Sequence, residues 1–521
     1  MPSYLSPGVY VEEVEAGARP IEGVGTSVAA FLGFAPQGPL NEPTLVTNWS
    51  QYVGVFGDFV EGSYLASAVY GYFANGGGNC YVVRIGGDGN GVAGQLPGGT
   101  AAGTAGSAAE ALLGGFRVRA LPGVTGEITV EVGGAEGEAP PNEAFKLVVK
   151  VDGEEKETYP SVSTRRGKDN VVTKVKEKSQ LISLEEVSRA AASAKPDTGT
   201  VVLAAAAAAP APAGSGTVAL SADDYIGDAD QRTGFGGLEA IDEITMVSVP
   251  DLMSAHQRGI LDAETVISVQ QALIAHCELM GDRVAILDAP PGLSPQQIKN
   301  WRMDTAGFDS KFATLYYPWI KVFDPSVGRN SFVPPSGHIA GVWARNDASR
   351  GVHKAPANEV MRGAVGLQTQ ITKGEHDLLN PIGVNCVRAF PGRGIRVWGA
   401  RTLSSDAAWR YLNVRRLFNY LEESILTGTQ WVVFEPNDDA LWARIRRTIS
   451  AFLVNEWRKG ALFGLTPDEA FYVKCDRETN PAESIDSGQV ICEVGVAPVK
   501  PAEFVVFRLA QLSGGTGSVD E

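Results

Sequence analysis

The chain has 521 residues, too many for one hydrophobic core, so two to four domains are expected. Its hydrophobic content of 44% and charged content of 20% are typical of a soluble globular protein and exclude a disordered chain. The net charge of −16 argues against a nucleic-acid-binding protein, which would be expected to carry a net basic charge.

The N-terminus has neither the basic nor the apolar region of a secretory signal, and the longest apolar run, Val201–Ala209, is too short to span a bilayer. The dispersed cysteines contain no CxxC pair, which predicts reduced thiols and neither a disulfide framework nor a zinc site. They are Cys80, Cys277, Cys386, Cys475 and Cys492. We expect synthesis and folding in the cytoplasm, and any release from the cell as part of a larger particle.

Residues 1–24 form an extended arm. Pro7-Gly8 interrupts it, and apolar residues between Val9 and Val14 alternate with glutamates, which is typical of a strand. Ordering this segment costs more backbone entropy than its few apolar side chains return on burial. The arm should therefore need a strand partner, on its own body or on another subunit.

Residues 25–91 read as strand, helix and strand: Ser27–Phe34, then Tyr64–Asn75 with Ser63 as the N-cap, then Cys80–Ile85. The same rhythm returns after residue 231. We expect a strand over Ile244–Val249, a helix over Thr265–Met280 and a strand over Val284–Leu287. This order predicts one α/β core domain built from residues 25–91 and 232–330.

Residues 92–231 are predicted to be an inserted domain. Segments rich in Gly, Ala, Ser and Pro, residues 86–115 and 195–216, separate it from the core as linkers. Between them, Phe116–Ala120 and Ile128–Val132 alternate with the period of a strand. Phe145–Val151 followed by Asp152-Gly153 indicates the first strand of a hairpin.

Residues 331–500 are predicted to form a C-terminal α/β domain. Its elements are a helix over Ala407–Leu426, a strand over Trp431–Phe434 and a helix over Asp438–Lys459 that Asn437 caps. Strands are expected over Val490–Val496 and Phe504–Leu509. The second of these makes residues 501–521 another terminal arm.

No motif supports catalysis or cofactor binding. Gly89–Gly94 matches GxGxxG, but the following Pro97-Gly98-Gly99 does not open the helix that a dinucleotide site needs. Ser336-Gly-His338 is better explained by turn and packing roles, and the five histidines form no i, i+4 metal pair. We therefore expect no catalytic residues, no cofactor and no metal.

Several motifs, in order along the chain, resemble those of contractile phage tail sheath proteins. The resemblance covers residues 3–90 and 232–511. In the N-terminal part it rests on Tyr4–Glu13, Phe31–Pro39, Tyr64–Tyr70, Asn75–Arg84, Arg232–Phe235 and Val249–Asp251. In the C-terminal part it rests on Tyr317–Lys321, Val333–His338, His353–Asn358, Gly392–Arg401, Trp409–Arg416, Phe434–Asn437 and Pro498–Glu503.

The resemblance implies a non-enzymatic sheath subunit with a multidomain α/β fold. It implies stacked hexameric rings around an inner tube, contraction from a metastable extended state, and baseplate and terminal cap proteins as further partners. No nucleic-acid partner and no membrane insertion are expected. Such particles are phage tails, R-type pyocins and related injection systems, the last of which can act outside the cell. The family's terminal strands interlace between subunits, which here implicates Val9, Tyr10, Val11, Val14, Phe504, Val505, Val506 and Phe507.

The resemblance also implies that a helix of the C-terminal domain faces the tube. Residues 381–460 hold twelve Arg or Lys against seven Asp or Glu, unlike the acidic remainder. Apolar residues between Leu441 and Leu453 recur at spacings of three and four, so that stripe should pack on the body. The predicted tube-facing residues are Arg444, Arg446, Arg447, Arg458 and Lys459. Pairing with Glu435, Asp438 or Asp439, or with a neighbouring sheath subunit, is the alternative.

Two other functions stay open at this point. An α/β nucleotide-binding enzyme with an inserted β domain would present a defined pocket. A different structural polymer, such as a shell or tube subunit, would not need strands at both chain ends. The inserted domain is expected on the outside of the sheath, because a surface that faces the tube leaves no room for it.

Overall fold

The protein is described by a computed structural model that covers residues 20–86, 110–113, 116–120, 128–134, 144–151, 154–164, 170–179, 181–186, 199–203 and 220–508. It divides into two compact units, one of residues 1–88 with 220–521 and one of residues 89–219. The predicted N-terminal arm residues and the GxGxxG match lie outside the described residues.

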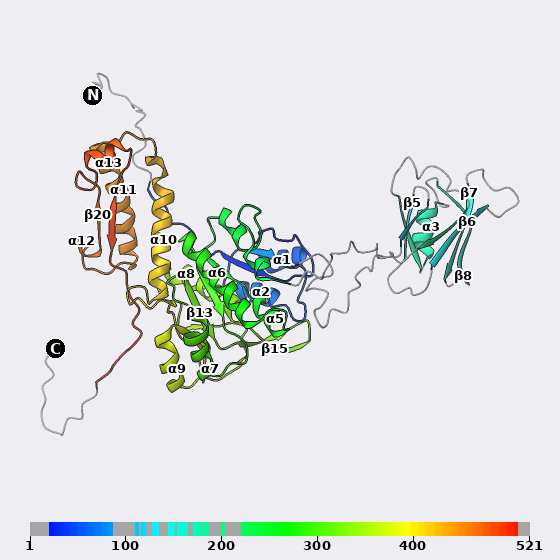
Figure 1. Ribbon diagram of the computed structural model, residues 1–521, viewed down its shortest axis with the longest axis horizontal. Coiled ribbons are helices and arrows are strands. Elements are labelled where there is room, and N and C mark those ends of the chain that lie inside the picture. Colours follow the sequence, from blue (N-terminus) through cyan, green and yellow to red (C-terminus); the bar gives the residue numbers. More distant parts are fainter. Residues whose placement is uncertain are drawn as a thin grey trace, which may run out of the picture. The chain divides into compact units, whose positions relative to one another are not determined.

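A nine-stranded sheet is the centre of the larger unit (Figure 1). Its central six strands are parallel and its outer strands pair antiparallel. In spatial order they are β16 (Glu359–Val360), β19 (Gly394–Val397), β18 (Val384–Phe390), β13 (Ala313–Tyr317), β12 (Val284–Asp288), β11 (Met246–Ser248), β1 (Ala29–Gly33), β3 (Cys80–Arg84) and β2 (Thr44–Val46). The predicted α/β class is confirmed.

The four middle strands, β1, β11, β12 and β13, are buried along their whole length, as a parallel sheet covered on both faces requires. The covering helices include α1 (Trp49–Phe56), α2 (Leu65–Asn75), α4 (Ala222–Ile226), α5 (Asp251–Gln257), α6 (Ala263–Met280), α7 (Pro295–Asn300), α8 (Ser336–Arg350) and α9 (Lys373–Leu379). α2 and α8 pack closely because Gly337 has no side chain; a Cβ there would lie 2.3 Å from the Cα of Ala68. The same unit contains a separate small sheet of β14 (Ile320–Asp324), β15 (Arg329–Val333) and β17 (Gly366–Leu367).

The C-terminal part gathers at one end of this unit around its own apolar core (Figure 1). It consists of α10 (Leu412–Thr429), α11 (Asp439–Arg458), α12 (Pro467–Ala470), β20 (Phe471–Lys474), α13 (Ala482–Asp486) and β21 (Glu493–Val496). Leu417, Leu441, Ile449 and Leu453 are among its buried residues. The nine-stranded sheet continues to Val397, past the limit of residue 330 that the sequence suggested for the core domain.

The unit of residues 89–219 contains two antiparallel sheets with α3 (Val171–Lys178). One sheet orders β10 (Gly199–Leu203), β6 (Ile128–Gly134), β7 (Ala144–Val151) and β8 (Glu154–Ser163). The other orders β4 (Glu110–Leu113), β5 (Phe116–Ala120) and β9 (Ile182–Glu186). The β-rich prediction is confirmed, including the hairpin of β7 and β8.

Several predicted element limits are wrong. α10 begins at Leu412 rather than Ala407, because the preceding residues form a loop that is closed by the bond from the Thr402 N–H to the Arg410 carbonyl and contains a turn from Asp406 to Trp409. The predicted strand Trp431–Phe434 is instead a short 3-10 helix followed by a turn, with φ of 68° at Phe434. The N-cap of α11 is Asp438, whose side chain accepts from the Leu441 N–H, and not Asn437.

The helix α2 also differs from the prediction at its start. It begins at Leu65 with Tyr64 at the N-cap position, so Ser63 is not the cap. The Asp251 carboxylate accepts from the backbone N–H groups of Tyr64 and Leu65, and the Ser63 hydroxyl shares the Leu65 N–H at 3.3 Å. A residue 186 positions away from Leu65 therefore supplies most of what the sequence assigned to a local serine.

Candidate functional site: arm roots and exposed strands

A buried carboxylate, that of Asp251, lies at the carboxyl edge of the parallel sheet. In folds of this kind ligands bind where the strand order reverses, which here is between the ends of β1 and β11. Asp251 occupies that point and accepts from the Phe34 N–H at 2.6 Å and the Ser63 hydroxyl at 3.0 Å. Burial raises its pKa to about 6, against the effect of these hydrogen bonds. At the point where a nucleotide would bind, the Asp251 carboxylate thus already bonds to groups of its own chain.

Asp288 is a second buried carboxylate at this edge, at the end of β12. It accepts from the Ser336 N–H at 3.1 Å and the Ser336 hydroxyl at 2.5 Å, at the start of α8. His338 is buried two residues further along α8, and burial lowers its pKa to about 4. The Ser336 hydroxyl therefore donates to a buried carboxylate at the start of its own helix.

Within the described residues, no three His, Cys, Asp or Glu side chains gather as metal ligands do. Over the same residues, no helix combines the length and the apolar character that crossing a membrane requires.

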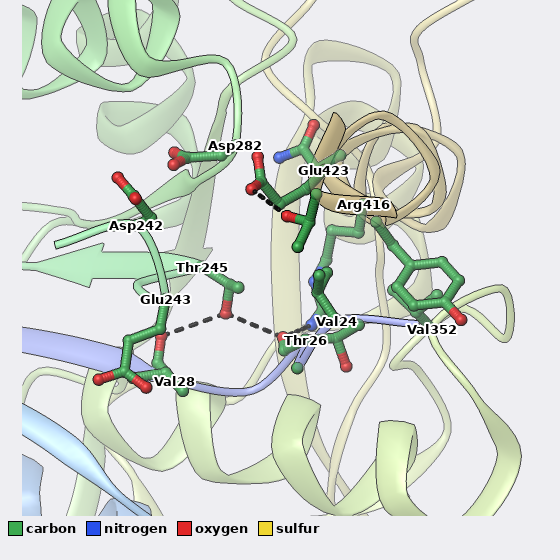
Figure 2. A pocket seen from close by; sticks show the side chains of 14 residues that line it. Val24, Thr26, Val28, Asp242, Glu243, Thr245, Asp282, Val352, Arg416 and Glu423 are labelled. Carbon is green, nitrogen blue, oxygen red and sulfur yellow. Dashed lines mark hydrogen bonds between the residues drawn. The ribbon is translucent and has the colours of Figure 1, made fainter. Parts of the chain in front are cut away.

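A cavity of about 250 Å³ lies at the opposite, amino edge of the sheet (Figure 2). Asp242, Glu243, Asp282 and Glu423 give it an acidic lining, and residues 24–28 form another wall. Burial, followed by the nearby charges of Asp282 and Asp242, raises the pKa of Glu423. An anionic ligand such as a nucleotide phosphate would be repelled here.

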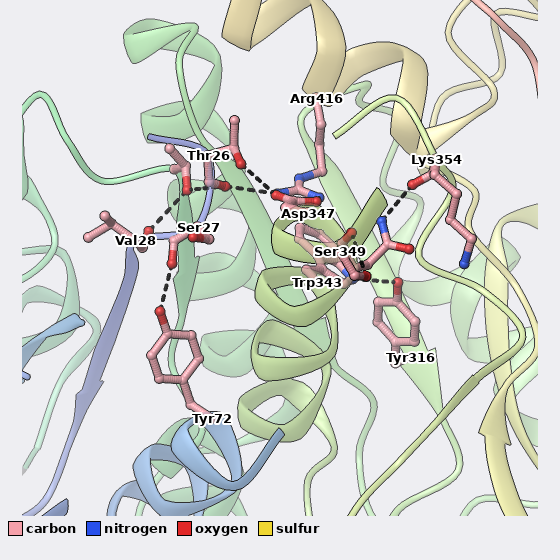
Figure 3. Close-up of polar contacts among 12 residues, drawn as sticks. Thr26, Ser27, Val28, Tyr72, Tyr316, Trp343, Asp347, Ser349, Lys354 and Arg416 are labelled. Atoms are coloured by element: carbon pink, nitrogen blue, oxygen red, sulfur yellow. Dashed lines mark hydrogen bonds and ion pairs between the residues drawn. The ribbon is translucent and has the colours of Figure 1, made fainter. Parts of the chain in front are cut away.

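Residues 20–28, which follow the predicted N-terminal arm, run between α10 and the sheet and form the N-terminal root. Arg416 of α10 pairs with Asp347 of α8 at 2.6 Å and donates to the Thr26 carbonyl at 2.9 Å. The Thr26 hydroxyl donates to Asp347 at 2.7 Å (Figure 3). The Tyr72 hydroxyl of α2 reaches the Ser27 carbonyl at 2.6 Å. Three elements thus hold this segment by buried polar contacts.

Two further contacts fix the root along α10. The Val24 N–H donates to the Ser424 hydroxyl at 3.1 Å. Ile21 is buried against Gly428, where a Cβ would lie 2.6 Å from the Ile21 side chain, so only glycine permits this approach. α10 continues past Gly428 to Thr429, beyond the predicted end at Leu426.

The C-terminal root is built around Glu503. Its carboxylate accepts from the Arg401 guanidinium at 2.5 and 2.9 Å and from the Asn380 amide at 2.7 Å. Burial alone would raise the pKa of Glu503, but the bonds from Arg401 and Asn380 and the Arg401 charge hold it below its usual value. Asn413 of α10 donates to the Val499 carbonyl at 3.0 Å. Both roots therefore contact α10.

Directly after this root, four consecutive apolar side chains extend into solvent. Phe504, Val505, Val506 and Phe507 are 73%, 67%, 77% and 85% exposed. Residues 501–508 form no strand in the isolated chain. The pairing of these residues with a neighbour stays a prediction. A run of apolar side chains this exposed is typical of an interaction surface.

Exposed apolar side chains also lie on and near the two-stranded sheet of β20 and β21. Val473 and Val496 pack on the C-terminal core, whereas Tyr472 is 59% exposed. Phe463 and Leu465, close by in sequence, are 73% and 89% exposed. Among the described residues no third strand joins this sheet, so each of its strands has an outer edge.

The predicted basic residues of α11 do not share one environment. Leu441, Ile445, Ile449, Phe452 and Leu453 are buried, which confirms the predicted stripe. Arg444 pairs with Glu435 at 2.7 Å, as the alternative interpretation expected, and Arg446 donates to the Cys475 carbonyl. Lys459 pairs with Glu456 at 2.7 Å. Arg447 and Arg458 are exposed, and in the described part of the chain no carboxylate lies within ion-pair distance of either.

Sequence reasoning missed the groups that hold the roots. Arg415 and Arg416 contributed to the basic character of residues 381–460, yet both are buried. Arg415 stacks over Phe312 and Trp409, and Arg416 pairs across 69 positions with Asp347. No local pattern marks such distant partners.

Comparison with known proteins places the sequence of this chain in one family. The phage tail sheath protein central domain model matches residues 233–403, and the phage tail sheath C-terminal domain model matches residues 404–511, together more than half of the chain. Tail sheath proteins of Vibrio phage KVP40 and Burkholderia phage BcepMu are each 27% identical, over 44% and 43% of this chain. The matched segments are 35% and 49% of those proteins, so the chain spans less than half of their length.

Solved structures share the fold over nearly the whole chain. The contracted sheath of the extracellular contractile injection system PVC matches with a TM-score of 0.58 and 22% identity, over 98% of this chain and 99% of that one. The contracted helical sheath of the anti-feeding prophage matches with a TM-score of 0.58 and 24% identity, over 98% and 100%. A chain of the anti-feeding prophage baseplate matches with a TM-score of 0.57 and 24% identity, over 98% and 99%.

Proposed function

The chain belongs to the phage tail sheath family, and from this premise we propose that it is a structural subunit of a contractile sheath. Subunits assemble as stacked hexameric rings around an inner tube, and contraction from a metastable extended state drives the tube through a target envelope. A head-to-tail interface that does not close generates this kind of helical polymer. The likeness to contracted sheaths of two injection systems supports this geometry.

The exposed apolar segment Phe504–Phe507 is the observation that carries the proposal. It is anchored at Glu503 and then leaves its own domain without a partner. Addition to the edge of a neighbour's sheet would pair its backbone groups and bury its side chains together. The sheet of β20 and β21, with its outer edges and exposed Tyr472, is the acceptor that we propose.

The N-terminal residues Val9, Tyr10, Val11 and Val14 are proposed as the second exchanged strand. Their root is fixed at Thr26 and Val24, so a strand given to a neighbour would transmit force to the body of its own subunit. Backbone pairing of this kind survives rotation of the rigid bodies on either side. Strand exchange therefore suits a sheath that changes shape without coming apart.

The other proposed partners are the tube protein, the baseplate and a terminal cap. A similar chain occurs in the anti-feeding prophage baseplate, which supports contact with a baseplate here. We propose that the chain is assembled in the cytoplasm into a phage tail or tail-like particle. The buried Asp251 carboxylate, which bonds to its own chain at the carboxyl edge of the sheet, supports this structural role over that of a nucleotide-binding enzyme.

Co-expression with the tube protein and negative-stain electron microscopy tests the proposal. The wild-type chain should give long, tube-filled sheaths. A chain that ends at Glu503, and one that lacks residues 1–18, should each stay folded by circular dichroism and yield no long sheaths. Sheaths of normal length from both truncated chains would contradict the strand-exchange proposal. A rise in melting temperature with a nucleotide would favour the enzyme instead.

A further inference from the structure

Two of the five cysteines lie opposite each other at the end of the sheet of β20 and β21. The register pairs Lys474 with Glu493, and the next residues in that register are Cys475 and Cys492. The two thiols are close enough for each to influence the pKa of the other. Directly opposed residues of antiparallel strands have the Cα separation that a disulfide spans.

The surrounding structure holds the two cysteine segments together. Asn480 is buried, and its side chain bonds to both the N–H and the carbonyl of Ile491, at 2.6 and 2.9 Å. The same amide reaches the Cys475 sulfur at 3.8 Å. Arg446 of α11 donates to the Cys475 carbonyl. The pair is therefore positioned by contacts that do not depend on a covalent bond.

The remaining cysteines have no such arrangement. Cys80, Cys277 and Cys386 lie on β3, α6 and β18 and are each buried in the larger core. Cys475 is also buried, whereas Cys492 is partly exposed, so one member of the pair is open to a reagent in solvent. The sequence predicted five separate reduced thiols, because the spacing of 475 and 492 matches no disulfide or metal motif.

We propose that Cys475 and Cys492 are a redox-sensitive pair that forms a cross-strand disulfide when the protein meets a low-molecular-weight disulfide in an oxidising medium. The Cys492 thiolate attacks one sulfur of the small disulfide, and one small thiol leaves. The Cys475 thiolate then attacks the Cys492 sulfur, and the second small thiol leaves. The cysteines lose two protons and two electrons, and the small disulfide takes up both.

The bond should form slowly at neutral pH. Burial raises the pKa of Cys475, and burial together with the neighbouring thiol raises that of Cys492 to about 12. Few thiolates are then present to attack. Slow formation suits a particle that persists after release from the reducing cytoplasm. The bond would close residues 476–491 into a loop and join the ends of β20 and β21.

The test uses the purified full-length chain. Reduced protein is incubated with oxidised glutathione, alkylated in denaturant and digested for mass spectrometry. We expect the loss of two of the five alkylatable thiols and a linked peptide that contains Cys475 and Cys492. Cys492→Ser, at the more exposed position, should lose no thiols, and Cys277→Ser should still give the linked peptide. Circular dichroism before oxidation establishes that each variant is folded.

Two results would overturn the inference in the wild-type protein, whatever the variants do. One is the recovery of all five thiols after prolonged oxidation. The other is glutathione that stays attached to Cys492 while Cys475 remains free. An outcome in which Cys277 or Cys386 is linked instead would also contradict it.

The consequence for assembly rests on the proposed sheath function and is measured separately. Oxidised sheaths should release fewer subunits in denaturant than reduced sheaths, and Cys492→Ser sheaths should show no difference between the two treatments. A linked peptide without this effect would retain the redox pair and remove its role in the sheath. A missing linked peptide would remove the pair and leave the sheath function untouched.

Discussion

The ion pair of Asp347 and Arg416 is the residue-scale contact on which the N-terminal root depends. Both side chains are at most 5% exposed, and Thr26 bonds to each of them (Figure 3). Arg416 also lies 4.7 Å from the ring of Trp343. Removal of one charge would leave the other buried without its partner, which is far more costly than removal of a surface charge.

We therefore expect Asp347→Asn to lower the free energy of unfolding by about 3–5 kcal/mol. Denaturant unfolding, followed by tryptophan fluorescence, measures the effect. Asp439→Asn is the matched control, because its pair with Arg477 is exposed at both ends and such pairs contribute little. Equal midpoints for the two variants would mean that the buried pair does not stabilise this region.

Asp288 should make stability depend on pH. Burial raises its pKa from 3.8 to about 7, although two hydrogen bonds from Ser336 act in the opposite direction. The folded state thus keeps a proton that the unfolded chain loses at lower pH. This stabilisation is fully present below about pH 4 and is lost as the pH rises through about 7.

Asp288→Asn removes the titration while keeping an oxygen for Ser336. The variant should gain stability relative to the wild type as the pH rises from about 4 to about 7, and Asp439→Asn should show no such trend over this range. Chemical denaturation at several pH values gives the comparison. A constant difference between wild type and Asp288→Asn would show that Asp288 does not change its protonation in this range.

At the scale of elements, hydrophobic periodicity predicted the buried face of α11 correctly, whereas the predicted starts of α10 and α2 were wrong. The stripe from Leu441 to Leu453 predicted the buried face of α11, because helical periodicity is a local property of the sequence. The start of α10 was misplaced because residue 410 bonds to Thr402 instead of joining the helix. The cap of α2 is supplied by Asp251, which no local pattern connects to Tyr64.

The basic face of α11 is narrower than the sequence suggested. Arg444 and Arg446 already have partners within the chain, whereas Arg447 and Arg458 are exposed. On a helix, positions 447 and 458 lie close to the same face, since eleven residues complete about three turns. If the chain contracts around a tube as we propose, a charged face of this kind suits a surface that has to separate from that tube.

We expect the double variant Arg447→Glu and Arg458→Glu to reduce tube-filled sheaths, most strongly at low ionic strength where charges are least screened. The monomer should melt as the wild type does, because neither side chain is buried. Arg329→Glu, at an exposed position of β15, is the control for an equal change at a different site. Wild-type yields of tube-filled sheaths from the double variant would exclude this face from tube binding.

For the whole molecule, α10 is the element that contacts both the N-terminal and the C-terminal root. Arg416 and Ser424 hold the N-terminal root, and Asn413 holds the C-terminal root. We infer that a pull on either arm reaches the same helix, so load from one neighbour can pass to the next without unfolding a domain. The sequence predicted the two arms from their strand patterns. It could not predict their common support, because the contacts join residues up to 400 positions apart.

The C-terminal arm offers a direct test of whether backbone pairing or side-chain burial joins the subunits. The N–H groups of successive residues in a strand point to opposite sides, and proline removes one of them. Proline at Val505 and at Val506 therefore deletes hydrogen bonds on different sides of the arm. Alanine at the same two positions removes apolar surface and keeps the N–H groups.

If the arm adds to the edge of a neighbouring sheet, one of Val505→Pro and Val506→Pro should abolish long sheaths and the other should retain them, because proline is tolerated on the free side of an edge strand. Loss with both prolines and tolerance of both alanines would mean that the arm lies inside the shared sheet, with a partner on each side. Electron microscopy of sheaths co-expressed with the tube protein measures their length. Alanine variants as defective as the proline variants would make the contact one of apolar surface, and normal sheaths from all four would remove the arm from assembly.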